Sequence, residues 1–145
     1  MKQKTFIIIA IILGTMLFTA QSKINMEGKS FTGFITSLCV ETVPPDPCAG
    51  YSDEMELYFK KDIVEIVSLR YKCNKTQRKS VFSKWKWISG NQIKVEKLNY
   101  ENQPFISGNI LFLKNNQLIG KHGSGYTQDF TFEPPDKKTQ VTWIK

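Results

Sequence analysis

Apolar and polar residues alternate with a period of two along most of the chain. Met55, Leu57 and Phe59 alternate with Glu54 and Glu56, which is typical of a β-strand with one face directed at a core. No stretch after the first twenty-two residues has the apolar spacing of an amphipathic helix. Similar strand-like runs cover residues 31–40, 55–60, 63–73, 81–87, 93–100, 110–114, 117–121 and 130–132, with a last one expected at 139–144.

Turn-forming residues separate these runs at short intervals. Asn115-Asn116 tolerates the positive φ of a tight hairpin, and the three prolines in residues 44–47 exclude a regular strand there. About eight to ten short strands joined by turns indicate an antiparallel sandwich or barrel. Because adjacent strands are joined by short turns, we predict an all-β fold, a single up-and-down barrel of about eight strands in one domain, residues 23–145.

The N-terminus has the pattern of a secretory signal peptide. Lys2 and Lys4 precede an apolar stretch at residues 6–18, and Ala20-Gln21-Ser22 fits a cleavage site. The apolar stretch, about 13 residues long, is shorter than the ~20 residues of a transmembrane helix, which is the alternative. We therefore predict a signal peptide at residues 1–22, cleaved near Ser22, and a periplasmic or secreted mature protein without a transmembrane span.

Charge gives a weaker indication of the partner. The formal net charge is +7, and removal of the leader lysines, Lys2 and Lys4, lowers it to +5. A basic protein is steered toward acidic partners, although the same excess also keeps a protein soluble. Nucleic acid is not expected as a partner of an exported protein.

Three cysteines, Cys39, Cys48 and Cys73, can supply one disulfide in an oxidising compartment. If residues 55–60 and 63–73 form a hairpin centred between Lys60 and Lys61, Cys73 lies opposite Cys48. That register favours a Cys48–Cys73 disulfide. A Cys39–Cys48 bond, which would close the proline-rich loop, and three free thiols are the alternatives.

Catalytic and metal-binding patterns are weak. His122 is the single histidine, and its spacing to Ser124 and Asp129 does not match a hydrolase nucleophile motif. Three scattered cysteines and one histidine do not form a zinc signature, and a disulfide accounts for them more simply than copper does. We expect no enzyme activity, no metal and no cofactor.

The segment Lys84-Trp85-Lys86-Trp87 is the strongest candidate for binding. On a strand both tryptophans point to one face, where they either pack in the core or line a cavity for an apolar ligand. With this second interpretation, we take Trp85, Trp87, Tyr71 and Phe105 as candidate ligand-binding residues of a cavity or its mouth.

Several segments resemble a known family. Phe31-Thr32-Gly33-Phe34-Ile35, the loop at residues 46–51 and the strand at 55–59 resemble the opening of the N-terminal domain of NlpE-type envelope lipoproteins. Residues 84–87 and 89–93 are similar to a strand–turn–strand segment of small lipocalin-like barrels. The resemblance covers residues 30–120 and implies an envelope-located, lipocalin-like barrel with a binding or sensing function.

The chain also departs from that family. Cys48 and Gly50 match the family's cysteine motif, whereas Cys39 stands nine residues before Cys48 instead of three. The leader contains no cysteine for lipid attachment. These differences argue against the family's copper-associated and lipoprotein-signalling roles.

Together these features predict a non-enzymatic β-barrel binding protein of the bacterial cell envelope. It would bind a small apolar ligand or an envelope protein, and it would serve either as a ligand-binding protein or in envelope sensing. The alternative is a protein–protein module, such as an inhibitor or immunity protein against a secreted toxin or enzyme, with the loop at residues 44–48 as a protruding wedge. The oligomeric state is left open.

Overall fold

The computed structural model describes residues 24–46, 48–101, 103–123 and 128–135, so the predicted leader and the strand expected at 139–144 lie outside the described residues. The described chain is all β, without a helix. Its strands are β1 (Ser30–Leu38), β2 (Tyr51–Phe59), β3 (Ile63–Lys72), β4 (Lys75–Ser89), β5 (Gln92–Val95), β6 (Asn99–Tyr100), β7 (Gln103–Pro104), β8 (Ile106–Lys114), β9 (Gln117–His122) and β10 (Phe130–Phe132).

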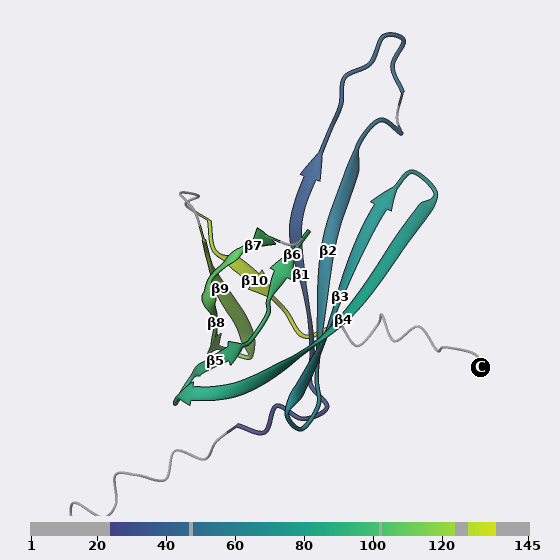
Figure 1. Ribbon diagram of the computed structural model, residues 1–145. Helices are drawn as coiled ribbons and strands as arrows, with labels where there is room; N and C mark the ends of the chain where they lie inside the picture. Colours follow the sequence, from purple (N-terminus) through teal and green to yellow (C-terminus); the bar gives the residue numbers. More distant parts are fainter. Residues whose placement is uncertain (1–23, 47, 102, 124–127, 136–145) are drawn as a thin grey trace, which may run out of the picture.

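Eight of these strands form one antiparallel sheet in the order β1-β2-β3-β4-β5-β8-β9-β10. The sheet curls until its first and last strands meet (Figure 1), where the backbone N–H and C=O of Thr32 bond with those of Glu133. The result is a nearly closed up-and-down barrel, which confirms the predicted fold. The short strands β6 and β7 form a separate hairpin within the connection from β5 to β8.

Two hairpin turns show how far local sequence sets the register. Asn115 and Asn116 have positive φ values of 50° and 61°, as expected for the tight turn between β8 and β9. The predicted centre of the β2–β3 hairpin is wrong by one residue. Phe59 pairs with Val64, and the N–H of Lys60 bonds with the C=O of Ile63, so the turn is centred between Lys61 and Asp62.

Side chains of the inward face fill the body of the barrel. The largest fully buried ones are Phe31, Phe59 and Phe132, and Trp85 and Trp87 pack against the core from β4. The Trp85 ring lies edge-on to Phe59 and to Trp87, with centroid separations of 5.3 and 6.4 Å, so both tryptophans are on the core side of β4. The body of the barrel is therefore a packed core.

The hairpin of β3 and β4 is longer than the barrel needs and projects beyond it (Figure 1). Cys73 lies at its tip with φ 54°, and Cys48 of the β1–β2 loop is bonded to it in a disulfide, with the Cα atoms 4.9 Å apart. This is the pairing that the sequence favoured. Cys39 remains a free, exposed thiol.

Candidate functional site

The barrel is not closed along its whole height. Above the hydrogen bonds between Thr32 and Glu133, β1 has a bulge between Phe34 and Thr36, and no ladder joins it to β10 within the described residues. A bulge bends the strand that carries it. The two strands diverge there and leave a hollow of about 600 Å³ at the end from which the long hairpin projects.

Aromatic rings make one wall of this hollow, which we call the aromatic hollow. Phe105 packs edge to face against Tyr100 and Phe130, with centroid separations of 6.4 and 4.9 Å. His122 stacks on Phe130 at 5.1 Å. A volume of this size lies within the range of small-molecule sites. The remaining lining residues are Phe34, Ile35, Thr36, Ser37, Gln128, Asp129 and Thr131.

A second hollow of about 470 Å³, the Arg70 cleft, is centred on one charged network. Arg70 donates from Nε and Nη2 to the two carboxylate oxygens of Asp53, at 2.8 Å each. Its Nη2 also donates to the hydroxyl of Tyr100 at 3.0 Å and to Oε1 of Glu101 at 2.6 Å. The other residues that line the Arg70 cleft are Ser68, Leu69, Gln77, Arg78 and Lys79.

The two carboxylates bound by Arg70 differ in their surroundings. The Asp53 side chain is 1% exposed and has its charge balanced in a bidentate pair, whereas Glu101 is 60% exposed. The hydrogen bonds to Asp53, and then to Glu101, hold the pKa of Arg70 above its ordinary value, against the opposing effect of burial. The guanidinium also lies over the ring of Tyr51, 4.2 Å from its centroid. Asp53 is therefore a structural partner of Arg70, and Glu101 is an exchangeable one.

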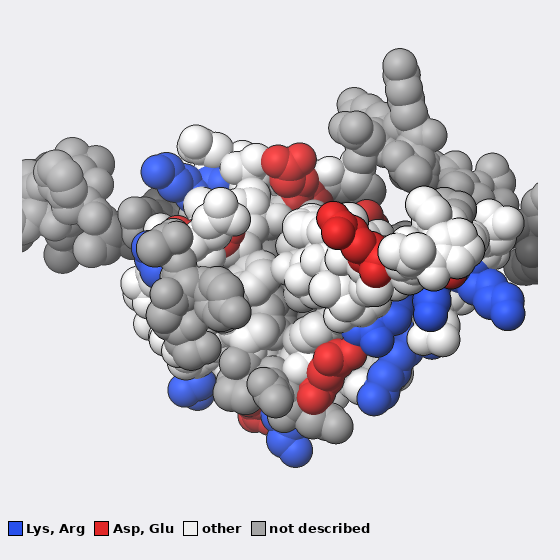
Figure 2. Space-filling model, turned by 90° about the horizontal axis from the view of Figure 1, so that it is seen from above, with Lys and Arg blue, Asp and Glu red and all other residues white. Residues whose placement is uncertain are grey.

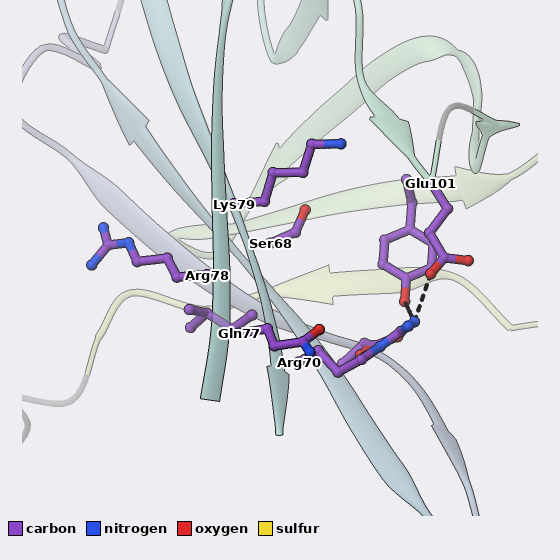
Figure 3. Close-up of a pocket in the computed structure, with 9 residues that line it drawn as sticks. Ser68, Arg70, Gln77, Arg78, Lys79 and Glu101 are labelled. Carbon is purple, nitrogen blue, oxygen red and sulfur yellow. Dashed lines mark hydrogen bonds and ion pairs between the residues drawn. The ribbon is translucent and has the colours of Figure 1, made fainter. Parts of the chain in front are cut away.

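Figure 3 shows how the remaining polar groups lie around the cleft. Lys79 extends from β4 toward the side where Glu101 lies, and Arg78 extends the opposite way. Ser68 pairs with Lys79, and Arg70 pairs with Gln77, so all four residues belong to the inward face of the projecting hairpin. Lys79 forms no salt bridge with any described residue.

Tyr100 connects the two hollows because it lines both of them. Its ring packs on Phe105 of the aromatic hollow, while its hydroxyl accepts a hydrogen bond from Arg70 of the cleft. Seen from above, uncharged side chains occupy much of the middle of this end, and most Lys and Arg side chains lie toward its rim (Figure 2). The two hollows thus adjoin at the open end, one walled in part by aromatic rings and the other built around the ion pairs of Arg70.

Of the four candidate ligand-binding residues, Phe105 lines the aromatic hollow. Trp85 and Trp87 face the core, and the Trp85 indole N–H donates to the carbonyl of Lys60 at 2.9 Å. Trp85 also lines a hollow of about 400 Å³ on the outer wall, among Asp62, Lys84, Lys86, Lys94 and Glu96. The four residues are therefore not brought together in one site.

Tyr71 points to the outer face of β3. Its hydroxyl donates to Oε2 of Glu54 at 3.4 Å, and Glu54 faces away from the core residues Met55 and Leu57. Burial, and then the nearby charge of Glu54, raises the pKa of Tyr71. Tyr71 lines neither hollow at the open end.

The network around Arg70 was not predicted from the sequence, although one signal was present. Asp53 lies two residues before Met55, so on a strand it faces the same side as Met55, Leu57 and Phe59, which is the core side of β2. A carboxylate at such a position needs a cationic partner. Arg70 pairs directly with Asp53 on the neighbouring strand, and a correct hairpin register would have identified it.

The sequence features weighed for catalysis and metal binding lie as follows. His122 is stacked on Phe130, and Ser124 lies outside the described residues. Among the residues that the structure describes, no group of three or more His, Cys, Asp or Glu side chains is arranged to hold a metal ion. In the same part of the chain, no helix has the length and apolar character needed to cross a bilayer.

Comparison with protein-family models, with curated proteins and with solved structures finds no match for this chain. The function is therefore inferred from the two hollows and their residues.

Proposed function

We propose that this protein is an exported, non-enzymatic binding protein of the bacterial cell envelope that takes a small apolar ligand at the open end of its barrel. The observation that carries this proposal is the aromatic hollow of about 600 Å³. The lining of Phe105, Phe130, Tyr100 and Ile35 offers apolar surface, and burial of apolar area provides the main favourable free energy of binding. The leader-like N-terminus supports export.

The location of the hollow differs from that of a ligand site inside a barrel. The body of the barrel is filled by side chains such as Phe31, Phe59 and Phe132. The ligand would therefore lie at the open seam between β1 and β10, with Phe34 of β1 as part of its outer wall.

Binding of Nile red, a neutral apolar dye, tests the proposal. Phe34 is 57% exposed and lines the hollow, whereas Phe82 is 64% exposed on β4 and is not among the lining residues. We expect Phe34→Ala to weaken binding about fivefold because it removes part of the apolar wall, and Phe82→Ala to leave it unchanged. The readout is a fluorescence titration. Equal losses in both variants, or no binding at micromolar dye, would contradict the proposal.

A second candidate, a protein–protein module, is favoured by the loop between β1 and β2. This loop projects beyond the sheet (Figure 1), its Val43 is completely exposed, and the Cys48–Cys73 disulfide ties it to the neighbouring hairpin. An exposed apolar side chain on a tethered loop suits insertion into a partner. This candidate requires that Val43→Ser abolish co-purification of a defined envelope partner while Nile red binding remains; retention of the partner would rule it out.

A further inference from the structure

We propose that the ligand is an amphiphile with a carboxylate head, whose apolar part lies in the aromatic hollow and whose carboxylate binds in the Arg70 cleft in place of Glu101. This inference rests on the proposed function and adds the chemical class of the ligand. The residue that carries this inference is Tyr100, which lines the aromatic hollow with its ring and accepts a hydrogen bond from Arg70 of the Arg70 cleft with its hydroxyl.

The cleft already binds a carboxylate. Glu101 accepts a hydrogen bond from Nη2 of Arg70 at 2.6 Å, from a turn where its own φ is 48°. At 60% exposure this ion pair is weak, because water competes for both charges. A ligand carboxylate can therefore replace Glu101 on Arg70 without leaving the guanidinium unpaired, and the bidentate bond to Asp53 remains.

Lys79 is a second cation, besides Arg70, that the ligand carboxylate could bind. It faces the same side of the sheet as Arg70, and the register makes the two residues diagonal neighbours on β3 and β4. Since Lys79 has no salt bridge with any described residue, its ammonium is available to a ligand anion. The recorded ion pair of Glu101 is with Arg70 alone, so a ligand carboxylate that also reaches Lys79 would bind two cations where Glu101 binds one.

A matched pair of probes tests the inference. Dodecanoate and dodecanol have the same chain and differ in the charge of the head, and both are titrated by calorimetry below the concentration at which they aggregate. We expect the wild-type protein to bind dodecanoate about tenfold more tightly than dodecanol, the size of effect that a charged hydrogen bond gives. Lys79→Gln should remove most of this preference.

Two further variants separate the role of the cleft from general electrostatics. Glu101→Gln removes the competing carboxylate, so dodecanoate should bind several-fold more tightly, with dodecanol unchanged. Lys114→Gln is the matched control, because Lys114 lies at the β8–β9 turn, away from both hollows. Arg70 is kept, since its pair with buried Asp53 is structural.

The outcomes distinguish the two proposals. If both probes bind with equal affinity and neither Lys79→Gln nor Glu101→Gln changes their ratio, the carboxylate inference fails and the apolar site stands. If neither probe binds, the proposed function fails as well. A loss of dodecanoate affinity in Lys114→Gln equal to that in Lys79→Gln would mean that overall charge, and not the cleft, sets the preference.

Discussion

Arg70 forms two ion pairs that differ in their exposure to solvent. Its pair with Asp53 is made at the edge of the core, where the carboxylate is 1% exposed. Its pair with Glu101 is made at the surface. A charge buried without a partner costs far more than an exposed ion pair contributes. The same guanidinium therefore neutralises a buried carboxylate of the neighbouring strand and also bonds to an exposed one.

This difference predicts the stability of two variants. Arg70→Leu leaves the Asp53 carboxylate buried and unpaired, and we expect it to lower the free energy of unfolding by about 3–5 kcal/mol. Glu101→Gln should cost less than about 1 kcal/mol because Glu101 is mostly exposed. Urea denaturation of both variants measures the difference. Similar losses in the two variants would show that Asp53 is not stabilised by Arg70.

Single residues also show why part of the site was not predictable from the sequence. On β3, apolar residues occur on both faces, so the sequence did not reveal that Val64 and Ile66, and not Tyr71, face the core. The register with β2 decides this, because Phe59 pairs with Val64. The parity of Asp53 was visible, but its partner depends on a register that was misjudged by one residue.

At the level of elements, the disulfide joins two segments that extend beyond the barrel. The β1–β2 loop and the tip of the β3–β4 hairpin project beyond the barrel (Figure 1), and the bond between Cys48 and Cys73 ties one to the other. A covalent link across 25 residues limits the conformations of the unfolded chain and so favours the folded one.

We expect the double variant Cys48→Ser/Cys73→Ser to lose about 3–4 kcal/mol of stability, the range for a loop of this length. Cys39→Ser is the matched control, since Cys39 is exposed and unbonded, and it should leave the unfolding midpoint unchanged. Thermal unfolding with and without reductant provides the measurement. A wild-type protein insensitive to reductant would contradict the expectation.

The elements themselves were more predictable than their assembly. Alternation and turn residues identified β2 and the β8–β9 turn at Asn115-Asn116, because these depend on neighbours in the chain. The position of the aromatic hollow depends on the bulge in β1 and on the shortness of β10, which bring together residues about a hundred positions apart. No local pattern reports such a contact.

For the whole molecule, the barrel closes at the lower part of the seam between β1 and β10, below the aromatic hollow. Two backbone hydrogen bonds between Thr32 and Glu133 join the strands there. Gly33 lets them approach, because a Cβ at this position would be 2.5 Å from Cδ1 of Phe132 and 2.9 Å from the carbonyl oxygen of Thr131. Closure therefore depends on the absence of a side chain at Gly33.

Gly33→Ala should push β10 away from β1 and lower the stability by about 1–3 kcal/mol, the usual cost of overpacking. Hydrogen exchange should show faster exchange at the amides of Thr32 and Glu133, while the β2–β3 ladder stays protected. Thr32→Ala, which keeps both backbone hydrogen bonds, should leave these rates close to those of the wild type. Unchanged exchange at the seam in Gly33→Ala would show that the strands do not close there.

The seam also has a consequence for biosynthesis. β1 is the first of the described strands and its partner β10 is the last, so a chain without Phe130–Phe132 has a vacant strand edge on β1. A vacant edge is a template for pairing with other chains. Translation products that terminate before Phe130 would keep β1 and β9 unpaired on one side, and we expect them to aggregate while the full-length protein does not.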